Sequence, residues 1–326
     1  MRPGRIIVTG GAGFIGSHLV EALNQRGWTD ILVVDQLGRD PKWRNLVGLQ
    51  VSEVLQGDAF REALHADRLP PAAAVFHFGA CSSTTETDTG YLLDTNYRYS
   101  VDVCEWCLRH GTRFVYASSA ATYGDGAQGY ADTDAVTPTL RPLTPYGFSK
   151  QLFDLWALHR GHLRSVVGLK FFNVYGPRET HKGDMRSLVH KAVEQLEATG
   201  ELCLFKSHRP EYRDGEQVRD FVWVGDAVQV ALFFLEHPAV SGLFNCGTGQ
   251  GRTWLDLARA VGRALGREPR IRFIDMPEVL RPRYQYRTVA DLRKLRAAGY
   301  AAAFTALDEG VRATVHAVTT GVPDHV

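Results

Sequence analysis

A glycine-rich stretch near the start of the chain restricts the possible fold more than any other feature. An apolar run at residues 5–8 leads into residues 9–16, TGGAGFIG, and a helical pattern follows over residues 17–26. Side chains at the motif glycines would obstruct the tight turn, the approach of a pyrophosphate to backbone N–H groups and the packing of strand on helix. The helix N-terminus would face the phosphates with its partial positive charge. This order predicts a dinucleotide-binding unit.

The next apolar run ends at an acidic residue. Residues 31–34, ILVV, are typical of a buried strand, and Asp35 follows close to the roughly 20-residue spacing at which a carboxylate meets the adenosine ribose. A carboxylate there favours NAD, whose 2′-hydroxyl is free. Arg39, Lys42 and Arg44 could instead neutralise the 2′-phosphate of NADP, or face solvent. The residues therefore leave the choice of dinucleotide open.

Strand-like and helical segments alternate through the first half of the chain. Further strands are predicted at residues 54–55, 73–76, 113–116 and 165–172. This alternation predicts an α/β fold, a Rossmann-type doubly wound parallel sheet with right-handed crossovers. Asp58, after the third strand, could reach the adenine of a bound dinucleotide or simply cap the next helix.

The alternation breaks after Asn173. Residues 176–220 are rich in Gly, Arg, Lys and His, whereas residues 221–224 and 242–246 look like returns to the sheet region. We expect a dinucleotide-binding domain of residues 1–175 with returning segments at about 221–250. Residues 176–220 and 251–326 would form a smaller C-terminal α/β lobe for the substrate.

The charge balance and the cysteines indicate the kind of partner and the location to expect. Lysine plus arginine number 37 and aspartate plus glutamate 36, so the net charge of +1 gives no reason to expect nucleic acid or a membrane surface. We find no signal-peptide-like or membrane-spanning run, and a cytoplasmic protein is expected. The five cysteines are expected to be reduced. Cys104 and Cys107 could form a redox or zinc half-site, but their helical pattern favours ordinary packing.

A tyrosine and a lysine four residues apart form the candidate reaction centre. Tyr146 and Lys150 would share one face at the start of a helix. A phenol has a pKa near ~10, which a cation close by would lower, so the pair could take a proton from a hydroxyl. Ser119, delivered by the strand at residues 113–116 to the ligand-binding edge of the sheet, could meet Tyr146 at a substrate hydroxyl. Ser119 could also be a plain turn or cap residue.

These motifs together resemble the extended short-chain dehydrogenase/reductase family over nearly the whole chain. Within it, several segments are similar to the epimerases that act on C6 of an ADP-linked heptose; these are residues 79–86, 116–124, 172–183, 219–222 and 283–285. The resemblance implies an isomerase that uses tightly bound NADP, with NAD possible, as a recycled cofactor. It also implies a nucleotide-sugar substrate, a homo-oligomer and a role in lipopolysaccharide precursor synthesis.

The resemblance also implies a role for individual residues. Tyr146 would be one acid/base and Lys182 the second, with Lys150 and Ser119 assisting; on residue type alone, Lys182 could equally be a phosphate contact or an exposed lysine. The cofactor site would comprise Gly10, Gly13, Phe14, Ile15, Gly16, Asp35, Gln36, Lys42, Asp58, Phe78, Gly79, Ala80, Cys81, Ser82, Asn96, Lys150 and Val174. The substrate site would comprise Asn173, Asp184, Phe205, Ser207, Arg219 and Tyr284.

Three departures from the family pattern and three rival functions accompany this assignment. Gly57 stands where the family pattern has a lysine, Asp184 replaces an expected serine, and the stretch at residues 209–218 is longer than the pattern. A nucleotide-hexose 4-epimerase would share Ser119, Tyr146 and Lys150 but need no second base. A 4,6-dehydratase is disfavoured because residues 119–123 lack an acidic pair. A non-catalytic dinucleotide-sensing regulator would have the same fold.

Overall fold

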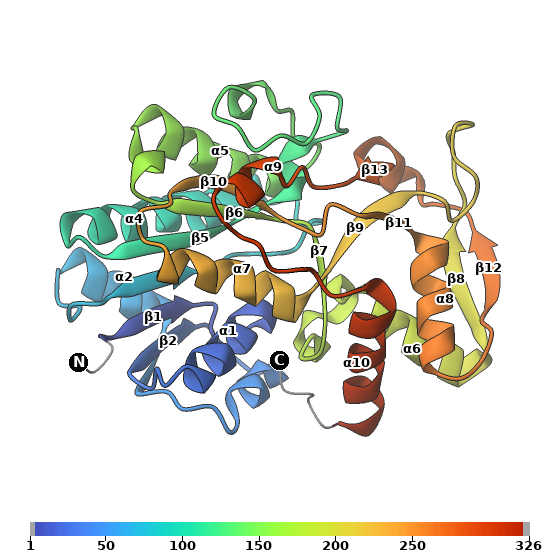
Figure 1. Cartoon of the computed structure of the whole chain (residues 1–326), viewed down its shortest axis with the longest axis horizontal. Coiled ribbons are helices and arrows are strands. Elements are labelled where there is room, and N and C mark those ends of the chain that lie inside the picture. Colours follow the sequence, from blue (N-terminus) through green and yellow to red (C-terminus); the bar gives the residue numbers. More distant parts are fainter. Residues whose placement is uncertain (1–3, 322–326) are drawn as a thin grey trace.

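A parallel sheet of seven strands forms the centre of the larger part of the molecule (Figure 1). The computed structural model describes residues 4–321. The strands are β1 (Ile6–Thr9), β2 (Ile31–Asp35), β3 (Glu53–Gln56), β4 (Ala74–His77), β5 (Arg113–Ser119), β6 (Val167–Phe171) and β10 (Gly242–Cys246). They lie in the order β10-β6-β5-β4-β1-β2-β3, and each pairing is parallel. This arrangement confirms the Rossmann-type doubly wound sheet.

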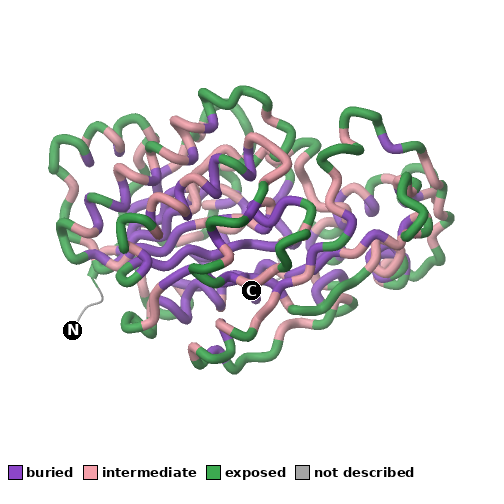
Figure 2. The backbone as a smooth tube through the Cα atoms, turned by 90° about the horizontal axis from the view of Figure 1, so that it is seen from above, coloured by how far each residue is buried: buried purple, intermediate pink, exposed green. Residues whose placement is uncertain are grey.

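Helices cover both faces of this sheet. They are α1 (Phe14–Gln25) and α7 (Val224–Glu236) on one face, and α2 (Gly57–His65), α4 (Tyr99–Arg109) and α5 (Pro145–His159) on the other. Because successive strand residues point to opposite faces, Ile6 and Val8 join the core under α1 and α7, whereas Ile7 joins the core under the other three. The central strands are accordingly buried along their length (Figure 2).

The cysteine pair of helix α4 lies in the second of these cores. Cys104 and Cys107 are fully buried there, and both are free thiols. Burial raises the pKa of both thiols, which disfavours the thiolate that redox or zinc chemistry requires. Ordinary helix packing is thus confirmed for this motif.

A smaller group of elements adjoins the carboxyl ends of the main strands. Its strands are β7 (Asn173–Tyr175), β9 (Val218–Trp223), β11 (Gly251–Thr253), β13 (Arg287–Thr288), β8 (Glu201–Phe205) and β12 (Arg270–Ile274). Its helices are α6 (Leu188–Thr199), α8 (Trp254–Ala264) and α10 (Leu307–Thr320), and their apolar faces share a separate core. Two short helices, α3 (Thr89–Leu92) and α9 (Arg293–Ala297), complete the set within residues 4–321.

The strand near residue 221 differs from the expected return to the main sheet. Strand β9 pairs with β7, β11 and β13 in a separate four-stranded sheet. The chain reaches the main sheet again only through α7, whose buried face covers it, and then through β10 at its edge. An apolar run alone does not reveal which sheet a strand joins. The limits of the two lobes remain a prediction.

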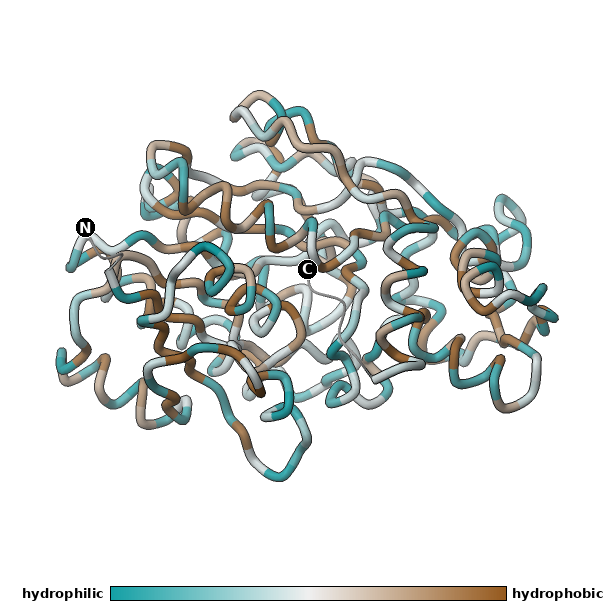
Figure 3. Tube along the Cα trace, turned by 60° about the horizontal axis from the view of Figure 1, so that its bottom comes forward, coloured by the Kyte–Doolittle hydropathy of each residue, from teal (hydrophilic) through white to brown (hydrophobic). Residues whose placement is uncertain are grey.

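Apolar residues concentrate in the interior of both parts, and hydrophilic residues in the outer loops (Figure 3). Over residues 4–321 we find no helix whose length and apolar character would let it cross a bilayer.

Candidate active site

The carboxyl ends of the main strands open into a cavity of about 740 Å³. Ligands bind at this edge in open parallel sheets. Most of the predicted site residues line it: Gly10, Gly13, Phe14, Ile15, Gly16, Asp35, Lys42, Phe78, Gly79, Ala80, Cys81, Ser82, Ser119, Tyr146, Lys150, Asn173, Val174 and Lys182. The remaining ones do not: Gln36, Asp58, Asn96, Asp184, Phe205, Ser207, Arg219 and Tyr284.

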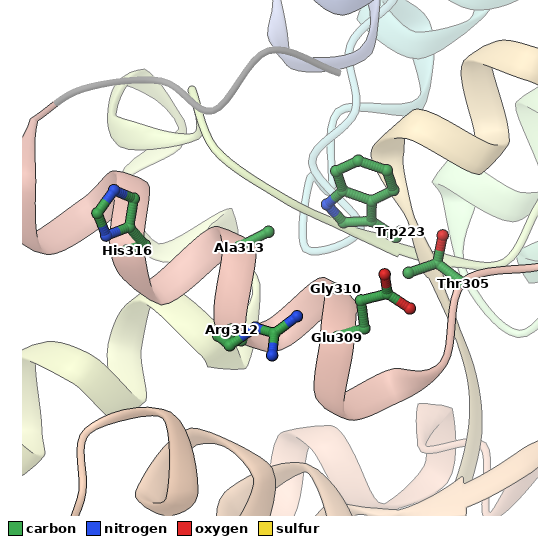
Figure 4. Close-up of a pocket in the computed structure, with 7 residues that line it drawn as sticks. All are labelled: Trp223, Thr305, Glu309, Gly310, Arg312, Ala313 and His316. Carbon is green, nitrogen blue, oxygen red and sulfur yellow. The ribbon is translucent and has the colours of Figure 1, made fainter.

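A second cavity, of about 370 Å³, lies between β9 and the start of α10 (Figure 4). The indole of Trp223 and the side chain of Thr305 lie on one side of it, and Glu309, Arg312 and His316 project from α10. None of the predicted site residues lines this cavity, and the two cavities share no lining residue. The larger cavity is therefore the candidate active site.

The glycine turn has the shape that a dinucleotide needs. Gly10 has a φ of +68°, and a Cβ on it would lie 2.7 Å from the backbone nitrogen of Gly79. A Cβ on Gly16 would lie 2.1 Å from the carbonyl oxygen of Gly10. Helix α1 begins at Phe14 and receives no side-chain cap from Gly13, so its N-terminus is left to an anionic ligand. These residues fit the pyrophosphate of a dinucleotide.

Asp35 and Lys42 form an ion pair beside this turn. The Lys42 Nζ lies 2.8 Å from Asp35 Oδ1, and the backbone nitrogen of Ala12 donates to Asp35 Oδ2 at 2.9 Å. Both side chains are largely buried. The cation that could neutralise a 2′-phosphate thus lies directly against the carboxylate that would bind a free ribose hydroxyl.

Asn96 supports the cavity wall from behind. It lies in a π-helical turn, Leu93–Arg98, and is almost completely buried. Its Oδ1 accepts from the backbone nitrogen of Cys81 at 2.8 Å, and its Nδ2 donates to the Cys81 carbonyl at 3.0 Å and to Ser149 Oγ at 3.0 Å. Asn96 therefore holds the strand-end run at residues 78–82 against helix α5, and no local sequence pattern indicated this bridging role.

Ser119, Tyr146 and Lys150 come together from β5 and from the first turns of α5. Helix α5 begins with Thr144 as its N-cap, whose side chain accepts from the Gly147 nitrogen at 3.0 Å, and with proline at its first position. This start turns Tyr146 and Lys150 toward the cavity on one helical face. Ser119 closes the group as a hydrogen-bonding partner of the Tyr146 phenol.

The charge state of Tyr146 differs from the expectation. Burial raises the pKa of Tyr146, and the hydrogen bond with Ser119 only partly opposes this. Burial also lowers the pKa of Lys150, to about 8, and its Nζ donates to the Ala117 carbonyl at 2.9 Å. The expected lowering of the Tyr146 pKa by Lys150 is therefore wrong, because exclusion of water from the phenol is the dominant influence.

Lys182 enters the cavity from the turn Thr180–Met185, on a different element from Tyr146. Its Nζ lies 2.8 Å from Glu179 Oε2 and 4.8 Å from the centre of the Phe14 ring. Asp184 lies in the same turn, and its carbonyl accepts from Lys191. Two potential proton carriers, one phenol and one amine, thus line one cavity.

Arg219 lies behind the cavity wall. Its guanidinium carbon lies 5.4 Å from the ring of Trp254 and 5.0 Å from that of Tyr284, and Trp254 Nε1 donates to the Tyr284 hydroxyl at 2.9 Å. Of these three, only Trp254 lines the cavity. Burial lowers the pKa of Arg219, and none of the ion pairs found in residues 4–321 involves it.

The other predicted residues are not part of the cavity lining. Phe205 ends β8, and the Ser207 nitrogen donates to Asp214 Oδ1 at 2.7 Å. Asp58 lies in the first turn of α2, and Gln36 directly follows β2.

Several lining residues escaped the sequence analysis, among them His181, Trp254 and Gln285. Glu179, the partner of Lys182, was also missed, although it stands in the segment at residues 172–183 on which the resemblance rests. The sequence feature that could have indicated Glu179 is its position as an acidic residue within a loop rich in basic residues. Gln285 likewise stands in a segment on which the resemblance rests, residues 283–285. Trp254 carries no comparable signal, because only the fold brings it to this edge.

Comparisons with known proteins agree with this geometry. An ADP-L-glycero-D-manno-heptose-6-epimerase of Nitratidesulfovibrio vulgaris (strain DP4) is 53% identical over 306 residues, covering 94% of this chain and 95% of that relative. A protein of the same name from Alkalilimnicola ehrlichii is 47% identical, covering 96% and 97%. The crystal structure of the Helicobacter pylori ADP-L-glycero-D-manno-heptose-6-epimerase has a TM-score of 0.82 at 26% identity, covering 98% and 97%.

The family profile of the NAD-dependent epimerases and dehydratases matches residues 6–247. This range contains the glycine turn, Ser119, Tyr146, Lys150 and Lys182. The chain therefore belongs to the NAD-dependent epimerase/dehydratase family.

Proposed function

We propose that this protein is an ADP-heptose 6-epimerase, which interconverts ADP-D-glycero-D-manno-heptose and ADP-L-glycero-D-manno-heptose. The observation that carries the proposal is the placement of Tyr146 and Lys182 on separate elements that line one cavity with the glycine turn. Inversion at a carbinol carbon changes the position of its oxygen, so two proton carriers are useful. The names of relatives at 53% and 47% identity over nearly the full chain support the same substrate.

The proposed mechanism is a transient oxidation at C6. The chemistry that the oxidised nicotinamide supplies, when bound, is acceptance of a hydride from C6 and its return to the other face of the resulting ketone. Tyr146 or Lys182 takes the hydroxyl proton as the C6–H bond breaks, and the other group gives a proton to the ketone oxygen as the new C6–H bond forms. General acid–base help of this kind contributes about 10²–10⁴ in rate.

The two proton carriers have different surroundings in the cavity. Burial keeps the Tyr146 phenol protonated, and Lys182 is held in an ion pair with Glu179. Tyr146 becomes a base only when positive charge bound in the cavity favours the phenolate. Ser119 hydrogen-bonds this phenol and would meet the same substrate oxygen.

We propose NADP as the preferred dinucleotide. Lys42 lies against Asp35, so the negative charge that would repel a 2′-phosphate is already paired. The backbone of the glycine turn and the run at residues 78–82 would hold the rest of the cofactor. On the substrate side, Asn173 lines the cavity and would meet the sugar nucleotide. Arg219 and Tyr284 lie behind the cavity wall, and their contact with the substrate stays a prediction of the resemblance.

The homo-oligomer and the cytoplasmic location also remain proposals. Exposed aromatic side chains on neighbouring helices, Tyr91 on α3 and Phe148 on α5, support an association surface, because aromatic residues are enriched at interfaces. Light scattering on the purified protein tests for the oligomer.

The function is tested in two steps. Denaturing the purified protein and identifying the released nucleotide distinguishes NADP from NAD. Proton NMR then follows inversion at C6 of an ADP-heptose, with a UDP-hexose assayed in parallel. Inversion of the heptose is expected; turnover of the hexose alone would favour a 4-epimerase, and turnover of neither would favour a dinucleotide-sensing regulator.

A further inference from the structure

A buried carboxylate lies directly beneath the amine of Lys182. Glu179 is completely buried, and its Oε2 lies 2.8 Å from the Lys182 Nζ. The lysine side chain remains partly exposed to the cavity. The pair therefore joins a fully enclosed anion to a cation that a substrate can reach.

Backbone groups fix the position of this carboxylate. The Ser187 nitrogen donates to Glu179 Oε2 at 2.8 Å, and the Gly176 nitrogen donates to Oε1 at 3.4 Å. Ser187 is the N-cap residue, directly before the first residue of helix α6. The Glu179 oxygens are thus held between the segment after β7 and the start of α6. Both donors are backbone groups, so they hold the carboxylate in place independently of the Lys182 side chain.

A histidine on α6 reinforces the same junction. His190 Nε2 lies 2.8 Å from the Gly176 carbonyl, which can only accept, so this nitrogen carries a proton and donates it. The same nitrogen lies 3.8 Å from Glu179 Oε1. His190 thus fixes Gly176, whose backbone nitrogen is one of the donors to Glu179.

The opposite side of the Lys182 amine is also occupied. Its Nζ lies 4.8 Å from the centre of the Phe14 ring, at the start of α1 in the glycine turn. An ammonium over an aromatic face is attracted by the ring. A lysine has a flexible four-carbon stem, so without such contacts its amine would sample many positions.

We propose that Glu179 is a positioning residue that holds the Lys182 ammonium at one side of the cavity as the proton donor of the epimerisation. This inference rests on the proposed function. The ion pair holds the ammonium at one position, so Lys182 gives its proton to the ketone oxygen on its own side of the cavity. Glu179 itself touches neither substrate nor cofactor.

A purely architectural role makes a different prediction. Glu179 could serve only to satisfy the backbone nitrogens of Ser187 and Gly176. Its loss would then disturb the fold in the same way whether or not Lys182 is present. A double-mutant cycle in kcat separates the two roles, because residues that act as a unit have non-additive effects.

The experiment compares Glu179→Gln, Lys182→Met and the double variant, each purified with its bound dinucleotide. The readouts are kcat and KM for ADP-heptose by proton NMR, together with the nucleotide content. We expect Glu179→Gln to lower kcat by about 10²-fold, the lower end of a general-acid contribution, with KM and nucleotide content nearly unchanged. The double variant should be no slower than Lys182→Met alone. An unchanged kcat in Glu179→Gln, or effects that multiply in the double variant, would overturn the proposal.

A neighbouring ion pair provides the matched control. Arg178 and Glu21 lie 2.9 Å apart and are also largely buried. Glu21→Gln should weaken the fold but change kcat by the same small factor in the wild-type and Lys182→Met backgrounds. If Glu179→Gln does not fold, Glu179→Asp replaces it: the charge is kept but the carboxylate is withdrawn, and kcat should still fall, whereas wild-type kcat would overturn the proposal. Failure of the proposed function would appear separately, as a wild-type protein that does not invert ADP-heptose.

Discussion

The buried ion pair between Lys170 and Asp154 should be among the most sensitive points of the fold. Lys170 Nζ lies 2.6 Å from Asp154 Oδ2, and both side chains are completely buried. Asp154 also accepts from the Tyr116 hydroxyl at 2.9 Å and from Ser118 Oγ at 2.7 Å. The pair therefore ties β5 and β6 to α5, the elements that bring Ser119 and Tyr146 together.

The expected magnitude follows from what each substitution leaves behind. Removing one partner of a buried pair costs about 3–5 kcal/mol, because the remaining charge is uncompensated. In Lys170→Met, Asp154 keeps its two hydroxyl donors, so we expect a loss near the lower limit, about 3 kcal/mol. In Asp154→Asn, the Lys170 ammonium keeps the Thr122 hydroxyl at 2.8 Å and the ring of Tyr123 but loses its counter-charge, so the loss should be at least as large.

Equilibrium urea unfolding at constant m-value measures these losses. The control is Lys206→Met, which breaks an exposed pair with Asp275 at 3.0 Å and should cost at most about 1 kcal/mol. Activity per folded molecule should also fall in the Lys170 and Asp154 variants, because the catalytic elements lose their common anchor. The reasoning is refuted if Lys170→Met costs no more than Lys206→Met.

Three further predictions concern the reaction centre and the buried histidine. Tyr146→Phe should keep bound nucleotide but lose several orders of magnitude in epimerisation, about 10²–10⁴ for general acid–base help alone; near-wild-type NMR turnover would remove Tyr146 from the mechanism. Lys182→Met should fold normally by circular dichroism but lose full turnover, and an unchanged rate would demote Lys182 to a binding residue. Burial lowers the pKa of His77 to about 3, so this residue's contribution is complete above its unfolded pKa of 6.5 and is lost as the pH falls toward 3. Urea unfolding at pH 5 should therefore show a loss of about 2 kcal/mol from this group relative to pH 7, which His77→Gln abolishes; an equal pH dependence in the variant would contradict the assignment.

Local sequence rules predicted the strands of the main sheet and their doubly wound, parallel arrangement. The apolar runs at β1, β2 and β4 are short and bounded by glycine or polar residues. Because they alternate with helices, the crossover connections between the parallel strands are expected to be right-handed. Because parallel strands all present their carboxyl ends at one edge, the sequence positions of Gly10, Asp35 and Ser119 were enough to place them at the same cavity.

Charge states and supporting contacts could not be predicted in this way. The spacing of Tyr146 and Lys150 indicates a shared helix face, but it says nothing about water, and burial proved to dominate the pKa of both groups. Asn96 is separated from Cys81 by a turn and a π-helical segment, so no periodic pattern links them.

The sequence by itself determined the dinucleotide-binding fold and the shared helical face of Tyr146 and Lys150, because backbone geometry and helical spacing are local properties. Only the tertiary structure decided that Glu179 pairs with Lys182, that Lys42 neutralises Asp35 and that Arg219 is enclosed between two aromatic rings. These pairings depend on which segments the packed cores bring within a few ångströms of each other. The strength of an electrostatic interaction depends on the distance between the two groups, and the order of residues along the chain does not give that distance.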